Sequence, residues 1–333
     1  MDVRAQAHLK RKRPMTSKFL ISGSLAGLLL AAGCNGSDST DGPAATPTET
    51  PAADSTDTTS TPAAASGMDG ILAGDWRPAN QKARDEYRHP AETLEFFEVE
   101  PDETVIEIWP GGGWYTNILA PYLKDEGTYI AALPDAAAGD YYQRAVDKFE
   151  TDFVARSGIY GDIQTTTLWK TAGPLAEEGT VDTILTFRNV HNWMNSEFAD
   201  KAFADMYAAL KPGGVLGVVE HSLPSSDPQN PIARDGYVHE DFVISLAKDA
   251  GFVLVESSDI NANPADTADH PFGVWTLPPV SRTTDRDGNA PEGFDAQTYL
   301  DIGESNRMTL KFRKPTAEEI AAAEAEAETE AED

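Results

Sequence analysis

Short apolar runs alternate with amphipathic stretches along residues 68–315. Apolar, β-branched runs bounded by Asp, Gly or Pro predict strands. Seven such runs occur, at Thr104–Trp109, Thr128–Leu133, Asp162–Leu168, Thr180–Phe187, Val215–Glu220, Phe252–Ser258 and Arg307–Phe312. Apolar positions at helical spacing predict helices over Pro90–Phe97, Tyr115–Leu123, Asp140–Arg156, Glu197–Leu210 and His239–Ala250.

The order of these elements indicates an α/β fold. Strands separated by helices predict a mostly parallel sheet whose crossover helices cover both faces. The last two strands, Phe252–Ser258 and Arg307–Phe312, are joined by a long loop, which favours an antiparallel hairpin at the sheet edge. The 248 residues of this body suffice for one domain.

The first 34 residues have the pattern of an export signal. Six basic residues up to Lys18 precede the apolar run Phe19–Ala32, which is too short to cross a membrane comfortably. Small residues then lead to Cys34, the only cysteine. This segment resembles a bacterial lipoprotein signal over residues 1–33, which implies cleavage before Cys34 and lipid attachment to its sulfur. Met15 is an alternative start.

Composition separates two further segments from the body. Residues 34–67 lack aromatic residues, Leu, Ile and Val, so we expect a disordered tether behind the lipid. Asn35 after the cysteine favours the outer membrane, with the body facing the periplasm. Residues 316–333 form an acidic Ala/Glu-rich tail. The net charge of −29 argues against a nucleic-acid partner, and we expect membrane contact only through the lipid.

A glycine-rich turn follows the first strand. Trp109-Pro110 leads into three glycines, of which Gly111 and Gly113 let a backbone approach a ligand closely. In open α/β sheets, ligands bind at the carboxyl ends of the strands. Glu107 lies within the strand, and burying its carboxylate is costly unless its oxygens accept hydrogen bonds. A dinucleotide fingerprint fits poorly, because Thr116 stands at its third glycine.

Two further segments support a methyltransferase interpretation. DTILTFRNVHNW places Arg188, Asn189 and His191 just past the fourth strand, and Glu220-His221 ends the fifth. With VIEIWPGGGWYTNILAPYL, these stretches resemble the class I S-adenosylmethionine-dependent methyltransferases, and within them an uncharacterised bacterial group of predicted methyltransferases. The resemblance covers residues 69–315 and implies a Rossmann-like fold.

The resemblance also implies roles for individual residues. Glu107, Gly111 and Gly113 match an E-x-G-x-G-x-G turn that holds the methionine part of S-adenosylmethionine, with Trp109 in place of the first glycine. Asp135 stands one or two positions beyond the usual ribose-binding acid, and no adenine-side acid is evident after the third strand. Arg188 and Asn189 are expected to line the cofactor side of the cleft.

Several chemistries compete for this cleft. His191 is our first candidate for a general base on a small-molecule methyl acceptor, with Tyr237 and His221 behind it. His191, His221 and His239 with Glu220 or Asp241 lack a compact metal-ligand spacing, so we expect no metal. The single cysteine is assigned to the lipid and no Gly-x-Ser-x-Gly occurs, which leaves a hydrolase without a nucleophile.

Three functions stay open at this point. The first is an active methyltransferase. S-adenosylmethionine is made in the cytosol, so this protein either meets the cofactor by an unknown route after export or has a signal that works inefficiently. The second is a non-catalytic envelope binding protein on a methyltransferase scaffold, which Trp109 and the displaced acid favour. The third is a nicotinamide oxidoreductase, which Thr116 disfavours.

Overall fold

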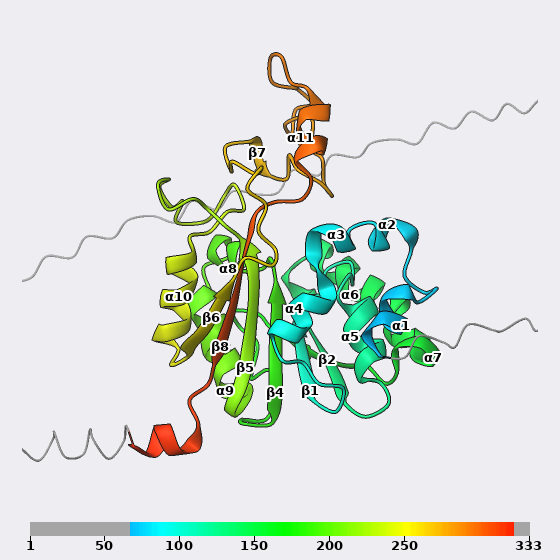
Figure 1. Cartoon of the computed structure of the whole chain (residues 1–333), viewed down its shortest axis with the longest axis vertical. Coiled ribbons are helices and arrows are strands. Elements are labelled where there is room, and N and C mark those ends of the chain that lie inside the picture. Colours follow the sequence, from blue (N-terminus) through cyan, green and yellow to red (C-terminus); the bar gives the residue numbers. More distant parts are fainter. Residues whose placement is uncertain (1–66, 323–333) are drawn as a thin grey trace, which may run out of the picture. The chain divides into compact units, whose positions relative to one another are not determined.

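The computed structural model describes residues 67–322, and its centre is a seven-stranded sheet (Figure 1). The strand order is β3-β2-β1-β4-β5-β8-β6. The strands are β1 Thr104–Ile108, β2 Thr128–Leu133, β3 Gln164–Thr167, β4 Val181–Phe187, β5 Leu210–His221, β6 Val253–Ser258 and β8 Arg307–Arg313. The short strand β7, Pro271–Val274, lies outside this sheet.

The sheet is parallel except at one side. β1 pairs in parallel with β2 and β4, β2 with β3, and β4 with β5. β8 runs antiparallel to both of its neighbours, β5 and β6, so it is inserted between them and β6 forms the edge. The expected Rossmann-like, mostly parallel sheet with an antiparallel edge hairpin is confirmed.

Alternating side chains along the strands build a separate core on each face. Ile106 and Ile108 of β1 point into a cluster that also contains residues of the helices α9 (Ala199–Ala209) and α10 (Glu240–Asp249). Val105 points into a second cluster with residues of α4 (Pro90–Phe96), α5 (Thr116–Leu123) and α6 (Asp140–Asp152). Helices therefore cover both faces of the sheet, as the sequence predicts.

The helices include several that the sequence pattern does not reveal. Those close to prediction are α4 Pro90–Phe96, α5 Thr116–Leu123, α6 Asp140–Asp152, α9 Ala199–Ala209 and α10 Glu240–Asp249. The unexpected ones are α1 Met68–Ala73, α2 Ala79–Lys82, α3 Asp85–Arg88, α7 Ser157–Tyr160, α8 Val190–Asn195 and α11 Ala296–Ile302, with 3₁₀ turns η1 Ala136–Ala138 and η2 Val154–Arg156. Each spans at most seven residues, too few for a periodic signal.

Two boundaries differ from the prediction for physical reasons. β5 begins at Leu210 rather than Val215, because Leu210 already pairs with Val181 and the Lys-Pro-Gly-Gly segment forms an irregularity within the pairing. The helix expected to reach Arg156 ends at Asp152, where η2 takes over.

The order of the central strands locates the ligand-binding edge. The chain runs outward from β1 through β2 to β3, and then returns to place β4 on the other side of β1. Such a reversal leaves a crevice at the carboxyl ends of β1 and β4, where ligands bind in open α/β sheets. In Figure 1, α2, α3 and the segment carrying β7 and α11 lie beyond this end of the strands.

Some expectations fall on residues that the structure does not describe. The signal over residues 1–33, lipidated Cys34, almost all of the tether and residues 323–333 of the tail lie outside the described range. Residues 317–322 form the start of a helix. Within residues 67–322, no helix has the length and apolarity needed to span a membrane.

Candidate functional site

The glycine turn after β1 opens onto empty space. Trp109, Gly111 and Gly113 all have left-handed backbone angles, with φ of 45°, 59° and 72°. A Cβ on Gly111 would meet no atom nearer than 4.0 Å, and one on Gly112 would meet none within 4 Å. Gly113 is needed for packing instead, since its Cβ would lie 2.0 Å from the Phe153 ring. Gly111 and Gly112 therefore form the ligand-facing part of the turn.

Glu107 is buried beneath the turn with one carboxylate oxygen occupied. Its Oε2 accepts hydrogen bonds from the Tyr129 hydroxyl at 2.5 Å and the Thr116 hydroxyl at 2.8 Å. The expectation that a buried Glu107 accepts hydrogen bonds is confirmed. Burial raises the pKa of Glu107 to about 7, although both hydrogen bonds act to lower it. No described residue donates to Oε1, and Glu107 lines the adjacent cavity.

Trp109 forms the first bend of the turn, and its ring is half-buried. The indole N–H donates to the carbonyl of Leu168 at 3.0 Å. The ring stacks on Trp169 at a centroid distance of 5.6 Å and also contacts Trp193 and Phe198. Trp109 therefore replaces glycine with a side chain that joins the core beside β3, while its outer surface still lines cavities on both sides of the turn.

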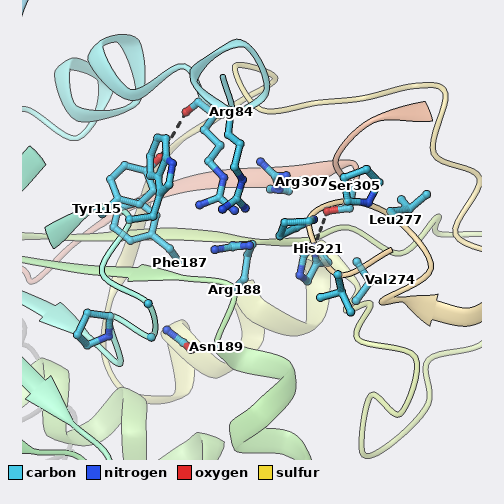
Figure 2. A pocket seen from close by; sticks show the side chains of 18 of the residues that line it. Arg84, Tyr115, Phe187, Arg188, Asn189, His221, Val274, Leu277, Ser305 and Arg307 are labelled. Carbon is cyan, nitrogen blue, oxygen red and sulfur yellow. Dashed lines mark hydrogen bonds between the residues drawn. The ribbon is translucent and has the colours of Figure 1, made fainter. Parts of the chain in front are cut away.

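A cavity of about 480 Å³ occupies the crevice between the ends of β1 and β4 (Figure 2). Five of the residues proposed from the sequence for the cofactor line it with His191, and four of them are Glu107, Trp109, Arg188 and Asn189. Asn189 donates from its side-chain amide to the carbonyl of Ile108 at 2.8 Å, so it ties the end of β4 to the end of β1. Gly111 also lines the cavity, whereas Gly113 does not.

A second cavity of about 250 Å³ lies on the other side of the turn. The two cavities share Trp109, Pro110, Gly111 and Asn189, so space extends along both sides of these residues. Polar lining is supplied by Asn192, Asn195 and Ser196, and no Asp or Glu lines this cavity. Aromatic walls come from Tyr141 and Tyr142.

Asp135 does not line either cavity. Its carboxylate accepts a hydrogen bond from the Ala137 backbone N–H at 2.8 Å and caps η1. Asp135 is therefore not placed to bind the ribose, as the family pattern suggests it does. Pro134 lines the second cavity, but the next residue, Asp135, already lies outside it.

His191 and Glu220 form a buried hydrogen-bonded pair. The Nδ1 atom of His191 lies 3.0 Å from Glu220 Oε1, and the backbone N–H of His191 donates to Oε2 at 3.3 Å. An ionised carboxylate only accepts hydrogen bonds, so the proton belongs on Nδ1 and Nε2 carries the lone pair. No described residue occupies Nε2, and His191 lines the cavity. This arrangement suits a general base held by a carboxylate.

His221 lies beside this pair in a different state. Its ring centroid is 5.4 Å from that of His191, and its Nδ1 atom lies 2.6 Å from the Ser305 hydroxyl (Figure 2). Burial lowers the pKa of His221 far below its usual value, and the positive charges of Arg188 and Arg307 act in the same direction. His221 is therefore neutral at neutral pH, and it lines the cavity while hydrogen-bonded to Ser305.

Tyr237 lies away from the cavity. Its hydroxyl donates to the Asp266 carboxylate at 3.0 Å and 3.1 Å, and the side chain is fully buried. Burial, together with the charge of Asp266, raises the pKa of Tyr237. Tyr237 is not among the cavity-lining residues, so the catalytic role predicted for it has no support in the geometry.

His191, Glu220 and His221 also form the one metal-compatible group found among the described residues. One potential ligand atom from each lies within 4.8 Å of the others. His239 is not part of this group, because its Nε2 atom bonds to the carbonyl of Asp227 at 2.8 Å. In the present arrangement, both oxygens of Glu220 and the Nδ1 atoms of both histidines already have hydrogen-bond partners.

Four arginines from segments that are far apart in the sequence also line the cavity. Arg84 and Arg88 come from the α2–α3 region, Arg188 follows β4, and Arg307 begins β8. Figure 2 shows Arg84, Arg188 and Arg307 pointing toward a common centre. Apart from Arg188, sequence reasoning missed these residues and their partner Glu304, because nothing in the local pattern predicts that residues 84–88 and 304–307 meet.

Comparisons with known proteins show distant structural similarity alone. No protein-family model matches the chain, and no curated protein matches it. A SAM-dependent methyltransferase from Aquifex aeolicus shares 19% identity over 56% of this chain and 93% of its own, with a TM-score of 0.42. The [4+2]-cyclase SpnF shares 19% identity over 73% and 86%, with a TM-score of 0.47.

A third solved structure belongs to SAM-dependent methyltransferases from Methanosarcina mazei. It shares 12% identity over 67% of this chain and 97% of its own, with a TM-score of 0.42. These similarities concern the fold alone, and one fold can support several chemistries.

Proposed function

We propose that the chain transfers a methyl group from S-adenosylmethionine to a small-molecule acceptor in the cavity between β1 and β4. One observation carries this proposal. The same cavity is lined by the open face of the glycine turn, by Glu107 with its free oxygen and by His191, which is hydrogen-bonded to Glu220. The turn offers a surface for close backbone approach, Glu107 offers an acceptor for an ammonium group, and His191 offers a general base.

The residues present fit the cofactor at both ends. Glu107 Oε1 has no donor among the described residues and matches the ammonium of a methionine moiety. Gly111 and Gly112 leave room for that moiety against the backbone. The second cavity, with aromatic walls and three polar side chains, matches a nucleoside whose hydroxyls bond to amides rather than to an acid. The bound cofactor supplies an electrophilic methyl group.

The chain itself contributes orientation and proton removal. Asn189 fixes the two strand ends between which the acceptor lies. Proximity and alignment of this kind are worth up to about 7–11 kcal/mol of the barrier. His191 Nε2 takes the proton from the hydroxyl or amine of the acceptor, and the ionised Glu220 stabilises the resulting imidazolium. General-base assistance typically contributes about 10²–10⁴-fold.

A labelled-methyl assay tests this function. The full chain is incubated with isotope-labelled S-adenosylmethionine and a panel of phenolic, quinone-like and amine acceptors. We expect label in at least one acceptor, and a rate about 10²–10⁴-fold lower for His191→Gln. Label transfer that is equally fast in His191→Gln would remove the assigned base.

A second function has one observation in its favour. The Trp109 ring occupies the side of the turn toward β3, where it packs on Trp169 and Phe198. If this ring fills the space that a nucleoside needs, the chain is a non-catalytic envelope protein that binds a small molecule in the larger cavity. Binding of small anions without any binding of S-adenosylhomocysteine would select this second function.

We also propose that the body is exported and lipid-anchored through Cys34, with its location at the outer membrane facing the periplasm. Support comes from the sequence of residues 1–67 alone. No nucleic-acid partner is proposed, because the net charge of −29 opposes binding to phosphate backbones.

A further inference from the structure

The larger cavity contains four arginines in a chain that is acidic as a whole. The chain carries a net charge of −29, yet Arg84, Arg88, Arg188 and Arg307 all line this one cavity. The four side chains come from three separate segments of the chain. Their positive charges repel one another, so the arrangement is unfavourable by itself. An arrangement of this kind calls for a compensating anion.

The protein supplies only part of that compensation. Glu304, which is 1% exposed, accepts a hydrogen bond from Arg84 Nε at 2.5 Å and from Arg88 Nε at 2.9 Å, and it also pairs with Arg307. Burial acts to raise the pKa of Glu304, but the surrounding arginines outweigh it and bring the pKa to about 2. This single ionised carboxylate faces four guanidinium groups.

Three of the guanidinium groups have unused donors, and in Arg307 the unused donor is the buried Nε atom. Arg88 is 2% exposed, and its Nη1 and Nη2 atoms are buried without any partner among the described residues. Its guanidinium lies over the Trp114 ring, 4.6 Å from the ring centroid, which holds its plane in place. The Arg188 guanidinium donates to no described residue, and burial together with the charge of Arg307 lowers its pKa to about 10. Unsatisfied buried donors are costly, so a ligand is expected to complete them.

The cluster lies apart from Asn189 and the glycine turn, so the structure places Arg188 with the other arginines and not on the cofactor side that the sequence suggests for it (Figure 2). In Figure 2, the Arg188 side chain points toward Arg84 and Arg307, and Asn189, which contacts the end of β1, lies on the other side. The cluster adjoins His221 and Ser305, close to the His191–Glu220 pair. A group bound by these arginines therefore lies on the acceptor side of the cavity.

We propose that Arg88, Arg188 and Arg307 bind an oxyanion group, a carboxylate or a phosphate, on the methyl acceptor. Planar guanidinium groups with paired N–H donors match both groups in a bidentate manner. The face-to-face stack of Tyr115 on Phe187, with ring centroids 3.5 Å apart, and the apolar residues around Leu277 line the remainder of the cavity. The acceptor is thus a small acid with an apolar body, an assignment that rests on the proposed methyl transfer.

Calorimetry with matched probes tests the anion site without any turnover. Benzoate, phenyl phosphate and the neutral isostere benzamide are titrated into the full chain. We expect at least one of the two anions to bind about tenfold or more tightly than benzamide, and the preferred anion identifies the source as carboxylate or phosphate. Arg188→Met should weaken that anion about tenfold or more, whereas Arg144→Met, an exposed arginine on α6, should leave its affinity unchanged.

Three outcomes would overturn the assignment. They are equal binding of benzamide, undiminished anion binding by Arg188→Met, and competition between the anion and S-adenosylhomocysteine, which would place the anion at the cofactor's own carboxylate. Simultaneous binding of both supports it. If S-adenosylhomocysteine does not bind at all while the anions do, the anion site stands and the proposed function fails.

Thermal unfolding gives an independent readout. Arg188→Met removes a charge that lacks a partner and is repelled by Arg307, so we expect the unliganded variant to melt about 2–4 °C higher than the wild type. The anion that binds best should raise the Tm of the wild type and not that of the variant. A lower Tm for unliganded Arg188→Met would mean that Arg188 stabilises the fold and is not reserved for a ligand.

Discussion

At the scale of single residues, Glu107 shows how burial prepares a group for a charged ligand. Its carboxylate is held by two hydroxyls, and its pKa of about 7 leaves it partly protonated at neutral pH. A ligand ammonium next to Oε1 would favour the ionised form. Binding of a ligand with an amino-acid moiety below pH 7 should therefore release a proton from Glu107.

The raised pKa of Glu107 predicts a pH-dependent stability. In the folded state Glu107 keeps its proton up to about pH 7, whereas the unfolded carboxyl releases it near 4.5. The free energy of unfolding therefore falls as pH rises through this window. Glu107→Gln should match the wild type at pH 4 and be up to about 3 kcal/mol more stable at pH 8, measured by urea unfolding. Glu150→Gln, on the exposed face of α6, serves as the control.

Glu220 is expected to act through His191. Glu220→Gln keeps one oxygen for His191 Nδ1, but it removes the charge that stabilises the imidazolium and the second oxygen, which accepts from the His191 backbone N–H. We expect kcat to fall while KM changes little. Steady-state kinetics measure both values, and an unchanged kcat would show that Glu220 is only structural.

Sequence reasoning located the site residues that follow a strand end and missed those that depend on tertiary contacts. Arg188, Asn189 and His191 line the cavity as expected, because they directly follow β4. Tyr237 does not line the cavity, and its hydroxyl donates to Asp266. The partners of Arg88 lie 216 residues away at Glu304, and no local pattern can show such a contact.

At the scale of elements, the strands were predictable and the short helices were not. Apolar runs bounded by turn residues gave all seven strands of the sheet within a few residues, apart from the early start of β5. α2, α3 and α8 are four to six residues long, and contacts made in the folded state determine them. These short elements nevertheless carry Arg88 and His191, so the least predictable part of the fold holds much of the site.

The turn between β1 and α5 predicts the consequence of removing Trp109. Trp109→Gly relaxes a left-handed residue, worth about 1 kcal/mol, but leaves Trp169 and Phe198 without their partner. Loss of a packed aromatic side chain costs about 3–5 kcal/mol, so urea unfolding should show net destabilisation. Trp109→Phe keeps a ring and should lose less.

The same variant distinguishes the two candidate functions. Under the methyltransferase account, the Trp109 ring borders the nucleoside space, so Trp109→Gly should not strengthen binding of S-adenosylhomocysteine. Calorimetry that shows binding only in Trp109→Gly would mean that the ring fills the nucleoside space in the wild type. The non-catalytic function would then be preferred.

At the scale of the whole molecule, the charge inside the larger cavity is opposite in sign to the net charge of the chain. An acidic chain keeps its surface away from anionic membranes and nucleic acids, while four arginines are gathered inside one cavity. Small anions are therefore expected to bind at this interior site. Binding of the preferred anion should weaken only modestly between low and moderate salt, because buried charges are screened less than exposed ones.

Export and anchoring predict a simple fractionation result. In a bacterial host that processes lipoproteins, the wild-type chain should appear in the membrane fraction, and Cys34→Ala should not. The physical reason is that acyl chains on Cys34 supply the membrane affinity, since the apolar run before it is removed on cleavage. Immunoblots of separated fractions measure this, and identical fractionation of the two proteins would refute the anchor.

Titration of S-adenosylhomocysteine into the full chain tests the central claim most directly. The account predicts micromolar binding that Gly111→Val abolishes, because a β-branched side chain would fill the open face of the turn. Gly179→Val is the matched control, since Gly179 has a similar φ of 68° with open space around it and does not line either cavity. NAD should not bind. Absence of S-adenosylhomocysteine binding, or equal binding by Gly111→Val, would contradict the account.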